Sequence, residues 1–168
     1  MGIVTNQGDD GFTGLYSNGE RVRKDHSLIE YAGSLDELDA FLALGEIILK
    51  SEGSSLFAGI IEEIRKQIHA GIMPFKLQEL PLYTGWIERQ IDLLEKENPV
   101  HNFEHSWTKK GSAVLNVART VCRRCERHFA TAEKYGGRKN PEAEMLVWLN
   151  RLSDLLFLLA VSEEQRLR

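Results

Sequence analysis

The sequence predicts an all-α protein, an up-and-down bundle of five helices behind a glycine-rich amino-terminal loop. Five segments repeat apolar residues at three- and four-residue spacing, which is typical of amphipathic helices. No segment shows the strict alternation of a half-buried strand, and the connections between segments are short, as in antiparallel bundles. We therefore expect a single domain over 1–168, with the loop in 1–26 and the helical bundle in 27–168.

The composition narrows the classes of function. A chain of 168 residues is long enough to bury a core without disulfides or a structural metal. The formal net charge of −4 argues against a general nucleic-acid surface, so we expect no nucleic-acid partner. No apolar run approaches the roughly 18 residues of a membrane span, and the first residues lack the basic and apolar regions of a signal peptide. We expect a cytoplasmic protein with no membrane partner.

The amino-terminal loop has the composition of turns. Residues 5–21, TNQGDDGFTGLYSNGER, interleave glycines with Asp, Asn and Thr. Glycines let backbone N–H groups approach phosphate oxygens closely, and Lys24 follows as a point charge. The stretch is not a Walker motif, because no G-K-[ST] follows it. The plainer alternative is an arm with no regular structure.

Capping signals and prolines place the first three helices. Ser34 with Glu37 three positions later forms a capping box, which predicts a helix over about 34–50. A stripe of isoleucines predicts the second helix over roughly 55–72. The third helix, about 82–97, ends where the residue before a proline resists helical backbone angles.

The fourth helix is expected from near Thr108 to Lys134, and the fifth from Pro141 to about Glu164. The fourth helix carries the only two cysteines, Cys122 and Cys125. A CxxC pair can indicate redox chemistry or half of a zinc site. Because there is no second pair and both cysteines lie on the apolar face, we expect two buried thiols and no metal site in the protein.

The fourth helix also carries a row of arginines. Arg119, Arg123 and Arg127 follow one another at i, i+4 and i+8 beside the apolar face. Like charges at this spacing repel by a few tenths of a kcal/mol per pair, so anions are expected opposite. One candidate is a polyphosphate, which guanidinium groups grip in a fork geometry. The other is a set of carboxylates on neighbouring helices, such as Asp36, Asp39 or Asp154.

The motifs taken together resemble the PduO-type ATP:cob(I)alamin adenosyltransferases. In the same order as that family, the chain reads TNQGDDGFTGL, ERVRKD, GSLDELD, ARTVCRRCER and WLNRLSDLLFLLA. The resemblance implies a five-helix bundle that forms homotrimers, with ATP and the corrinoid bound between subunits. It implies transfer of the 5′-deoxyadenosyl group of ATP to the cobalt of reduced cobalamin, with Mg²⁺ present and triphosphate released. It also implies hand-off of the product to an adenosylcobalamin-dependent enzyme.

The resemblance assigns roles to particular residues. The loop that folds over ATP comprises Thr5, Asn6, Gln7, Gly8, Asp9, Gly11, Thr13 and Gly14. Lys24 contacts the phosphates, and the helical nucleotide residues are Arg123, Arg124, Glu126, Arg127 and Asn150. Arg119 pairs with Asp36 across the subunit interface, and these two residues with Arg123 form the catalytic set. Phe103 helps to displace the lower ligand of the cobalt.

Three positions differ from the family pattern. The family has a basic residue at Asn6 and an asparagine at Asp39, and it reads FILPGG where this chain reads FEHSWTKKG. The last difference lies near the corrinoid. Two other functions therefore remain open. One is a non-catalytic paralogue that acts as an ATP-responsive corrinoid-binding or carrier protein, and the other is a plain bundle with an internal salt-bridge network.

Overall fold

The computed structural model describes the chain except for residues 1–3, 5, 7, 16–19, 73–78, 101–105, 137–139 and 167–168. Three of the predicted site residues, Thr5, Gln7 and Phe103, lie outside the described residues. The remaining predicted site residues are described.

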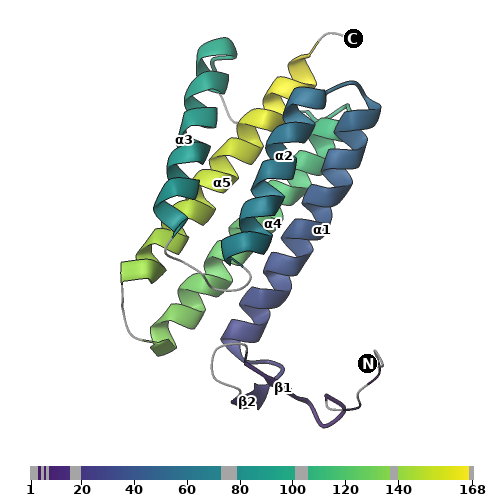
Figure 1. Cartoon of the computed structure of the whole chain (residues 1–168). Coiled ribbons are helices and arrows are strands. Elements are labelled where there is room, and N and C mark those ends of the chain that lie inside the picture. The colour runs from purple at the N-terminus through teal and green to yellow at the C-terminus, as the bar shows by residue number, and fades with distance from the viewer. Residues whose placement is uncertain are drawn as a thin grey trace.

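The predicted five-helix bundle is confirmed. The helices are α1 (Ser27–Ser51), α2 (Ser55–Gln67), α3 (Leu80–Glu97), α4 (Lys110–Gly136) and α5 (Asn140–Gln165). A short π-helical turn, η1 (Ile68–Ile72), continues α2. Figure 1 shows the five helices side by side along one direction. In this bundle α4 packs against both α1 and α5, whereas α2 packs mainly on α1 and α3 mainly on α5.

The first helix begins earlier than predicted. Its N-cap is His26, whose Nδ1 accepts a hydrogen bond from the backbone N–H of Leu28 at 3.2 Å. Ser34 is buried inside the helix and donates to the carbonyl oxygen of Tyr31 at 2.8 Å, so the predicted capping box is wrong. The reason is burial, because the ring of Tyr31 packs 4.9 Å from that of Phe129 in the core and holds the extra turns helical.

Two short strands in the amino-terminal segment were not predicted. Strand β1 (Phe12–Gly14) pairs with β2 (Arg21–Arg23) in antiparallel register, with Thr13 opposite Val22. The hairpin lies beyond the amino end of α1 (Figure 1). Each strand has three residues with no fully buried side chain, so the sequence offers no apolar alternation that would reveal it.

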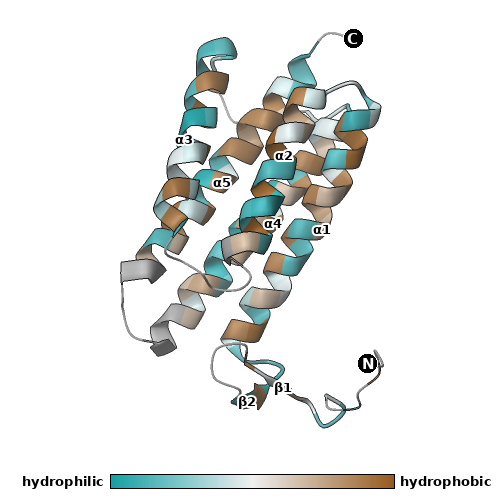
Figure 2. Cartoon of the chain, in the orientation of Figure 1, coloured by the Kyte–Doolittle hydropathy of each residue, from teal (hydrophilic) through white to brown (hydrophobic). Residues whose placement is uncertain are grey.

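Helix α5 forms the middle of the core. Over Ala143–Gln165 it is long and apolar enough to cross a membrane by length and composition alone, but 67% of its most apolar 18-residue window is buried inside the bundle. Its buried side chains include those of Trp148, Leu152 and Leu156. Figure 2 shows hydrophobic residues along this helix where the neighbouring helices cover it. The pattern is that of a core helix in a bundle.

The ends of α4 and α5 cap each other. The carboxylate of Glu164 accepts from the backbone N–H groups of Thr108 at 3.0 Å and Lys109 at 3.3 Å, and from the hydroxyls of Thr108 and Ser112. In return, Lys109 Nζ donates to the carbonyl oxygens of Glu163, at 2.9 Å, and Arg166. The backbone N–H groups at the start of α4 and the backbone carbonyl oxygens at the end of α5 therefore find hydrogen-bond partners on the neighbouring helix.

The hydrogen bonds that Glu164 accepts predict a contribution to stability that is lost in acid. Partial burial raises the pKa of the Glu164 carboxyl, but hydrogen bonds from Ser112 and Thr108 outweigh burial and lower that pKa to about 2, from 4.5. The folded state therefore favours the carboxylate, and its contribution is complete above about pH 4.5 and is lost as the pH falls toward 2. We expect Glu164→Gln to lower the free energy of unfolding by about 1 kcal/mol at pH 7.

Urea unfolding at pH 7 and pH 3 measures this effect. The difference between the native protein and the Glu164→Gln variant should shrink at pH 3. Glu97→Gln removes a charge from the exposed end of α3 and serves as the control, with no change at either pH. If Glu164→Gln lowers the free energy of unfolding equally at both pH values, the result would contradict the low pKa assigned to Glu164.

Candidate active site

The predicted row of arginines lies on α4 beside its buried face. Arg119 is half-buried, while Arg123 and Arg127 are exposed. The Nε of Arg119 donates to Asn116 Oδ1 at 3.0 Å, and Arg127 donates to the carbonyl oxygen of Arg123 at 3.1 Å. Two of the carboxylates proposed as alternative partners are engaged by other arginines: Asp39 by Arg65 at 3.1 Å and Asp154 by Arg151 at 3.7 Å.

Helices α4 and α5 bring three of the predicted nucleotide residues together. Asn150 Nδ2 donates to Glu126 Oε1 at 3.4 Å, and Glu126 Oε2 lies 3.5 Å from Arg123 Nη1. The side chain of Arg123 is 48% exposed, so its guanidinium keeps donors for a ligand in solution. We call Arg123, Glu126 and Asn150 the α4–α5 group. An exposed cation, an acceptor and an amide at this spacing can bind an anionic ligand that also carries hydroxyls.

Arg124 faces the other side of α4. It forms an ion pair with Glu37 of α1, and one turn further on His128 Nδ1 lies 3.3 Å from the carbonyl oxygen of Glu30. The structure therefore does not bring Arg124 together with the α4–α5 group. Successive residues on a helix are about 100° apart, which places Arg123 and Arg124 on different edges of α4.

The described part of the loop is organised around Lys24. The backbone N–H of Lys24 donates to the carbonyl oxygen of Gly11 at 2.9 Å, and Gly11 has a φ of +82°, which favours glycine. A Cβ on Gly8 would stand 3.1 Å from Lys24 Nζ, so glycine lets the ammonium approach the loop backbone. Asn6 also has a positive φ, of 56°. The loop thus presents a lysine ammonium over a glycine backbone, the arrangement expected for phosphate binding.

Asp10 holds the loop to the hairpin, a role that the sequence analysis missed. Its carboxylate accepts from the Phe12 backbone N–H at 3.1 Å and from Arg21 at 2.8 Å. Hydrogen bonds from Phe12 and Arg21 lower the pKa of Asp10. In the sequence, the turn-forming pair Asp9-Asp10 could have indicated this role of Asp10. The strand that carries its partner Arg21 could not be predicted.

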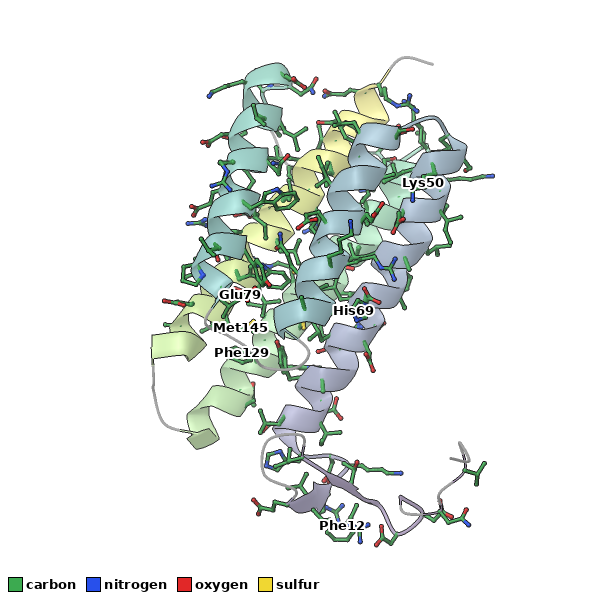
Figure 3. The ribbon with its side chains drawn as sticks, in the orientation of Figure 1. Phe12, Lys50, His69, Glu79, Phe129 and Met145 are labelled. Carbon is green, nitrogen blue, oxygen red and sulfur yellow. The ribbon has the colours of Figure 1, made fainter. Side chains whose placement is uncertain are left out.

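The hairpin and the α4–α5 group face different sides of α4. A cavity of about 770 Å³ separates the hairpin from the start of α1 and the end of α4, and Arg23, His26, Glu30 and His128 are among its lining residues. His128 and Glu30 belong to the α1 side of α4, where Arg124 also points. Figure 3 shows Phe12 on the hairpin, apart from the bundle in which Phe129 and Met145 lie. Neither Lys24 nor a member of the α4–α5 group is among the residues that line this cavity.

A second cavity lies between α3 and α5. Its volume is about 510 Å³, and it is lined by Glu88, Ile91, Asp92, Glu95, Val100, Arg151, Asp154, Phe157 and Leu158. Val100 directly precedes the undescribed residues 101–105, and Trp107, soon after them, packs edge-on against Phe157 with ring centroids 6.4 Å apart. Val100 therefore lines this cavity, and Trp107 contacts one of the residues that line it.

The two cysteines are core residues, as expected. Both are buried, and Cys122 Sγ donates to the carbonyl oxygen of Leu149 at 3.3 Å. Burial raises the pKa of the Cys122 thiol well above its usual value and raises that of Cys125 to about 12. Among the described residues, no group of three or more His, Cys, Asp or Glu side chains could hold a metal ion. Neither redox nor zinc chemistry fits this pair.

Comparison with known proteins identifies relatives along the whole chain. Residues 3–163 match the family model described as cobalamin adenosyltransferase. The chain is 30% identical to the corrinoid adenosyltransferase PduO of Salmonella typhimurium over 98% of its own length and 50% of that protein. It is 31% identical to the corrinoid adenosyltransferase of Bacillus subtilis, over 94% of this chain and 83% of that protein. The chain thus spans about half the length of its Salmonella relative.

Solved structures show the same fold. A variant PduO-type ATP:co(I)rrinoid adenosyltransferase from Lactobacillus reuteri, complexed with ATP, superposes with a TM-score of 0.80 at 24% identity, over 96% of this chain and 94% of that chain. Another variant from the same organism, complexed with cobalamin and ATP, gives a TM-score of 0.78 at 24% identity, over 95% of this chain and 91% of that chain.

The burial of Cys122 and Cys125 predicts that neither thiol reacts in the folded protein. Because burial raises both pKa values, almost no thiolate exists at pH 8, and the sulfur atoms are covered as well. A chromogenic disulfide reagent should therefore release no colour from the native chain within minutes and two equivalents per chain in denaturant. Rapid release from the native chain would contradict the burial of this pair.

Proposed function

This chain belongs to the cobalamin adenosyltransferase family, and on that premise we propose that it transfers the 5′-deoxyadenosyl group of ATP to the cobalt of cob(I)alamin. The products are adenosylcobalamin and triphosphate. The observation that carries this proposal is the α4–α5 group, in which Arg123, Glu126 and Asn150 converge on an exposed edge of the bundle. We propose that the enzyme works in the cytoplasm and passes its product to an adenosylcobalamin-dependent enzyme.

The triphosphate of ATP is proposed to lie along the arginine row. Arg123 and Arg127 are exposed cations one helical turn apart, which suits charge-assisted hydrogen bonds to successive phosphates. Glu126 and Asn150 stand beside Arg123 and suit the ribose hydroxyls, which both donate and accept. Mg²⁺ prefers phosphate oxygens with few protein ligands, so the ion is proposed to arrive with ATP as its magnesium complex.

The site is proposed to be completed by a second copy of the chain. The amino-terminal hairpin lies beyond the amino end of α1 (Figure 1), and the loop of one chain is proposed to cover the nucleotide on its neighbour. Helices α1 and α4 are adjacent and expose Leu44, Ile47 and Val117, which are 46%, 66% and 38% exposed. Exposed apolar side chains on adjacent helices are consistent with an interface on this face.

We propose a homotrimer built on this α1–α4 face. Asp36 is exposed on α1, and Arg119 is half-buried on α4 with Asn116 as its hydrogen-bond partner at 3.0 Å. Across an interface between copies, Arg119 of one chain is proposed to pair with Asp36 of the next. The pair would fix the relative position of the two chains and therefore of the two halves of the site.

The corrinoid is proposed to bind near the cavity between α3 and α5. Phe103 belongs to the segment between Val100, which lines this cavity, and Trp107, which packs on Phe157 in the cavity wall. An apolar surface there would keep water and the lower ligand away from the cobalt. The differences from the FILPGG pattern leave this aromatic wall in place, because Trp107 packs on Phe157 and Thr108 is held by Glu164.

The chemistry then requires little covalent participation from the protein. Cob(I)alamin is itself a strong nucleophile, so the cobalt–carbon bond forms at the 5′ carbon as the bond from that carbon to the triphosphate oxygen breaks. The tasks of this chain are alignment and stabilisation of the growing charge on the leaving triphosphate. Arg123 and Arg127 are proposed to stabilise that charge together with Lys24 of the neighbouring copy, while Arg119 and Asp36 hold the alignment.

Anaerobic mixing of the protein with MgATP and chemically reduced cobalamin tests this function. We expect the visible spectrum of an alkylated, light-sensitive corrinoid to appear. Arg123→Ala should raise the Kd for ATP by about tenfold or more, because a charge-assisted hydrogen bond contributes roughly 1.5–3 kcal/mol. Arg89→Ala, which removes an exposed arginine from α3, is the matched control and should leave this Kd unchanged.

The two measurements separate the alternatives. Binding of ATP and cobalamin without any alkylated product would indicate a carrier rather than an enzyme. An ATP affinity that is the same in the native protein and in Arg123→Ala would contradict the nucleotide site. A melting temperature that does not respond to MgATP would instead indicate a plain bundle.

The proposed trimer predicts the effect of a charge on the α1–α4 face. Ile47→Asp should convert the oligomer to monomer in equilibrium sedimentation and weaken ATP binding about tenfold or more, because a lone chain lacks half of the site. Leu82→Asp is the control, since Leu82 is 74% exposed on α3, away from that face, and should leave assembly unchanged. A native protein that is monomeric and still transfers the adenosyl group would contradict the shared site.

A further inference from the structure

The cavity between α3 and α5 has one apolar part and one acidic part. Val100, Phe157, Leu158 and Ile91 supply apolar walls. The same cavity is lined by four carboxyl groups, those of Glu88, Asp92, Glu95 and Asp154, against a single guanidinium, that of Arg151. The lining therefore carries a clear excess of negative charge, in contrast to the row of arginines proposed for the phosphates.

The ion pairs of Arg151 leave part of this charge uncompensated. Arg151 Nε lies 3.1 Å from Glu88 Oε1, and its Nη1 lies 3.7 Å from Asp154 Oδ2. In the part of the chain that the structure describes, no hydrogen bond or ion pair joins Asp92 or Glu95 to another side chain. These two residues are exposed and three positions apart on α3, so their carboxylates line the same cavity one helical turn apart.

We propose that Asp92 and Glu95 make this cavity select corrinoids by charge, accepting the neutral amide side chains of the macrocycle and rejecting corrinoids that carry a free carboxylate in their place. This inference rests on the proposed function, because it takes the cavity as part of the corrinoid site. A primary amide has two N–H donors, and an ionised carboxylate is a pure acceptor, so the two are complementary. A carboxylate on the ligand brings no donor and adds a like charge.

The surroundings strengthen the discrimination. The Asp154 side chain is 53% exposed, and Asp92 and Glu95 are exposed as well, so water reaches these carboxylates when the cavity is empty. Phe157, with Trp107 packed on it, forms an aromatic wall beside these charges. A corrinoid that fills the cavity would displace this water, and repulsion between like charges grows as water is excluded, so a carboxylate on the ligand would weaken binding more here than on an open surface.

The test compares cobalamin with cobalamin monocarboxylates, in which one propionamide side chain has been hydrolysed to the free acid. The full-length protein loaded with MgATP is titrated with the cob(II) form of each, and the visible spectrum reports the Kd. We expect the native protein to bind the monocarboxylates about tenfold more weakly or worse, given the size of like-charge repulsion at a partly hydrated site. Asp92→Asn combined with Glu95→Gln should reduce this ratio to about twofold.

Steady-state rates give a second readout. The ratio of KM values for the two corrinoids should follow the ratio of Kd values, whereas kcat for each corrinoid should change little, since the proposed selection acts on binding. Glu97→Gln removes a charge from the same helix outside the cavity and should keep the native ratio. Thermal unfolding of each variant checks that the bundle is intact.

The outcomes distinguish this inference from the proposed function. Equal affinity of the native protein for both corrinoids would overturn the charge selection while leaving adenosyl transfer in place. A ratio that survives in the double variant, or that Glu97→Gln lowers equally, would also overturn it. If the protein neither binds cobalamin nor alkylates it, the proposed function fails and this inference fails with it.

Discussion

The packing of α4 between α1 and α5 is the constraint on which the rest of the molecule depends. Cys122, Cys125 and Phe129 are buried in this contact, and their burial fixes the rotation of α4 about its own axis. That rotation decides where each arginine points. Arg123 meets Glu126 and Asn150 on the α5 side, while Arg124 meets Glu37 on the α1 side. A rotation of α4 by one residue could bring Arg124 to the edge that Arg123 now occupies and would turn Arg123 toward the core.

The same constraint divides the proposed nucleotide site between two copies of the chain. The amino-terminal hairpin lies beyond the amino end of α1 (Figure 1), whereas Asn150 of α5 contacts Glu126 of α4 within the bundle. A single chain thus offers cations in two places rather than one pocket. The exposed apolar side chains on α1 and α4 supply the physical reason for copies to associate, since burying them removes apolar area from water.

The unusual stretch before α4 has a consistent structural role. Where the family pattern described above has an apolar turn of proline and glycine, this chain has His105, Ser106, Trp107 and Thr108, and Lys109 follows. Trp107 packs on Phe157, and the next two residues join the mutual capping of α4 and α5 through Glu164. Hydrogen bonds thus replace the stiffness of a Pro-Gly turn and hold one flank of the Phe103 segment beside the cavity.

The sequence alone determined the five helices and the arginine row, because helical periodicity depends only on neighbours along the chain. It also predicted buried cysteines, from their place on the apolar face. The start of α1 was missed because burial of Tyr31 outweighs the local capping signal at Ser34. The hairpin, the partners of Asp39 and Asp154 and the acidic cavity were decided only by the tertiary structure, because each depends on residues that are distant in the sequence and meet only when the helices pack.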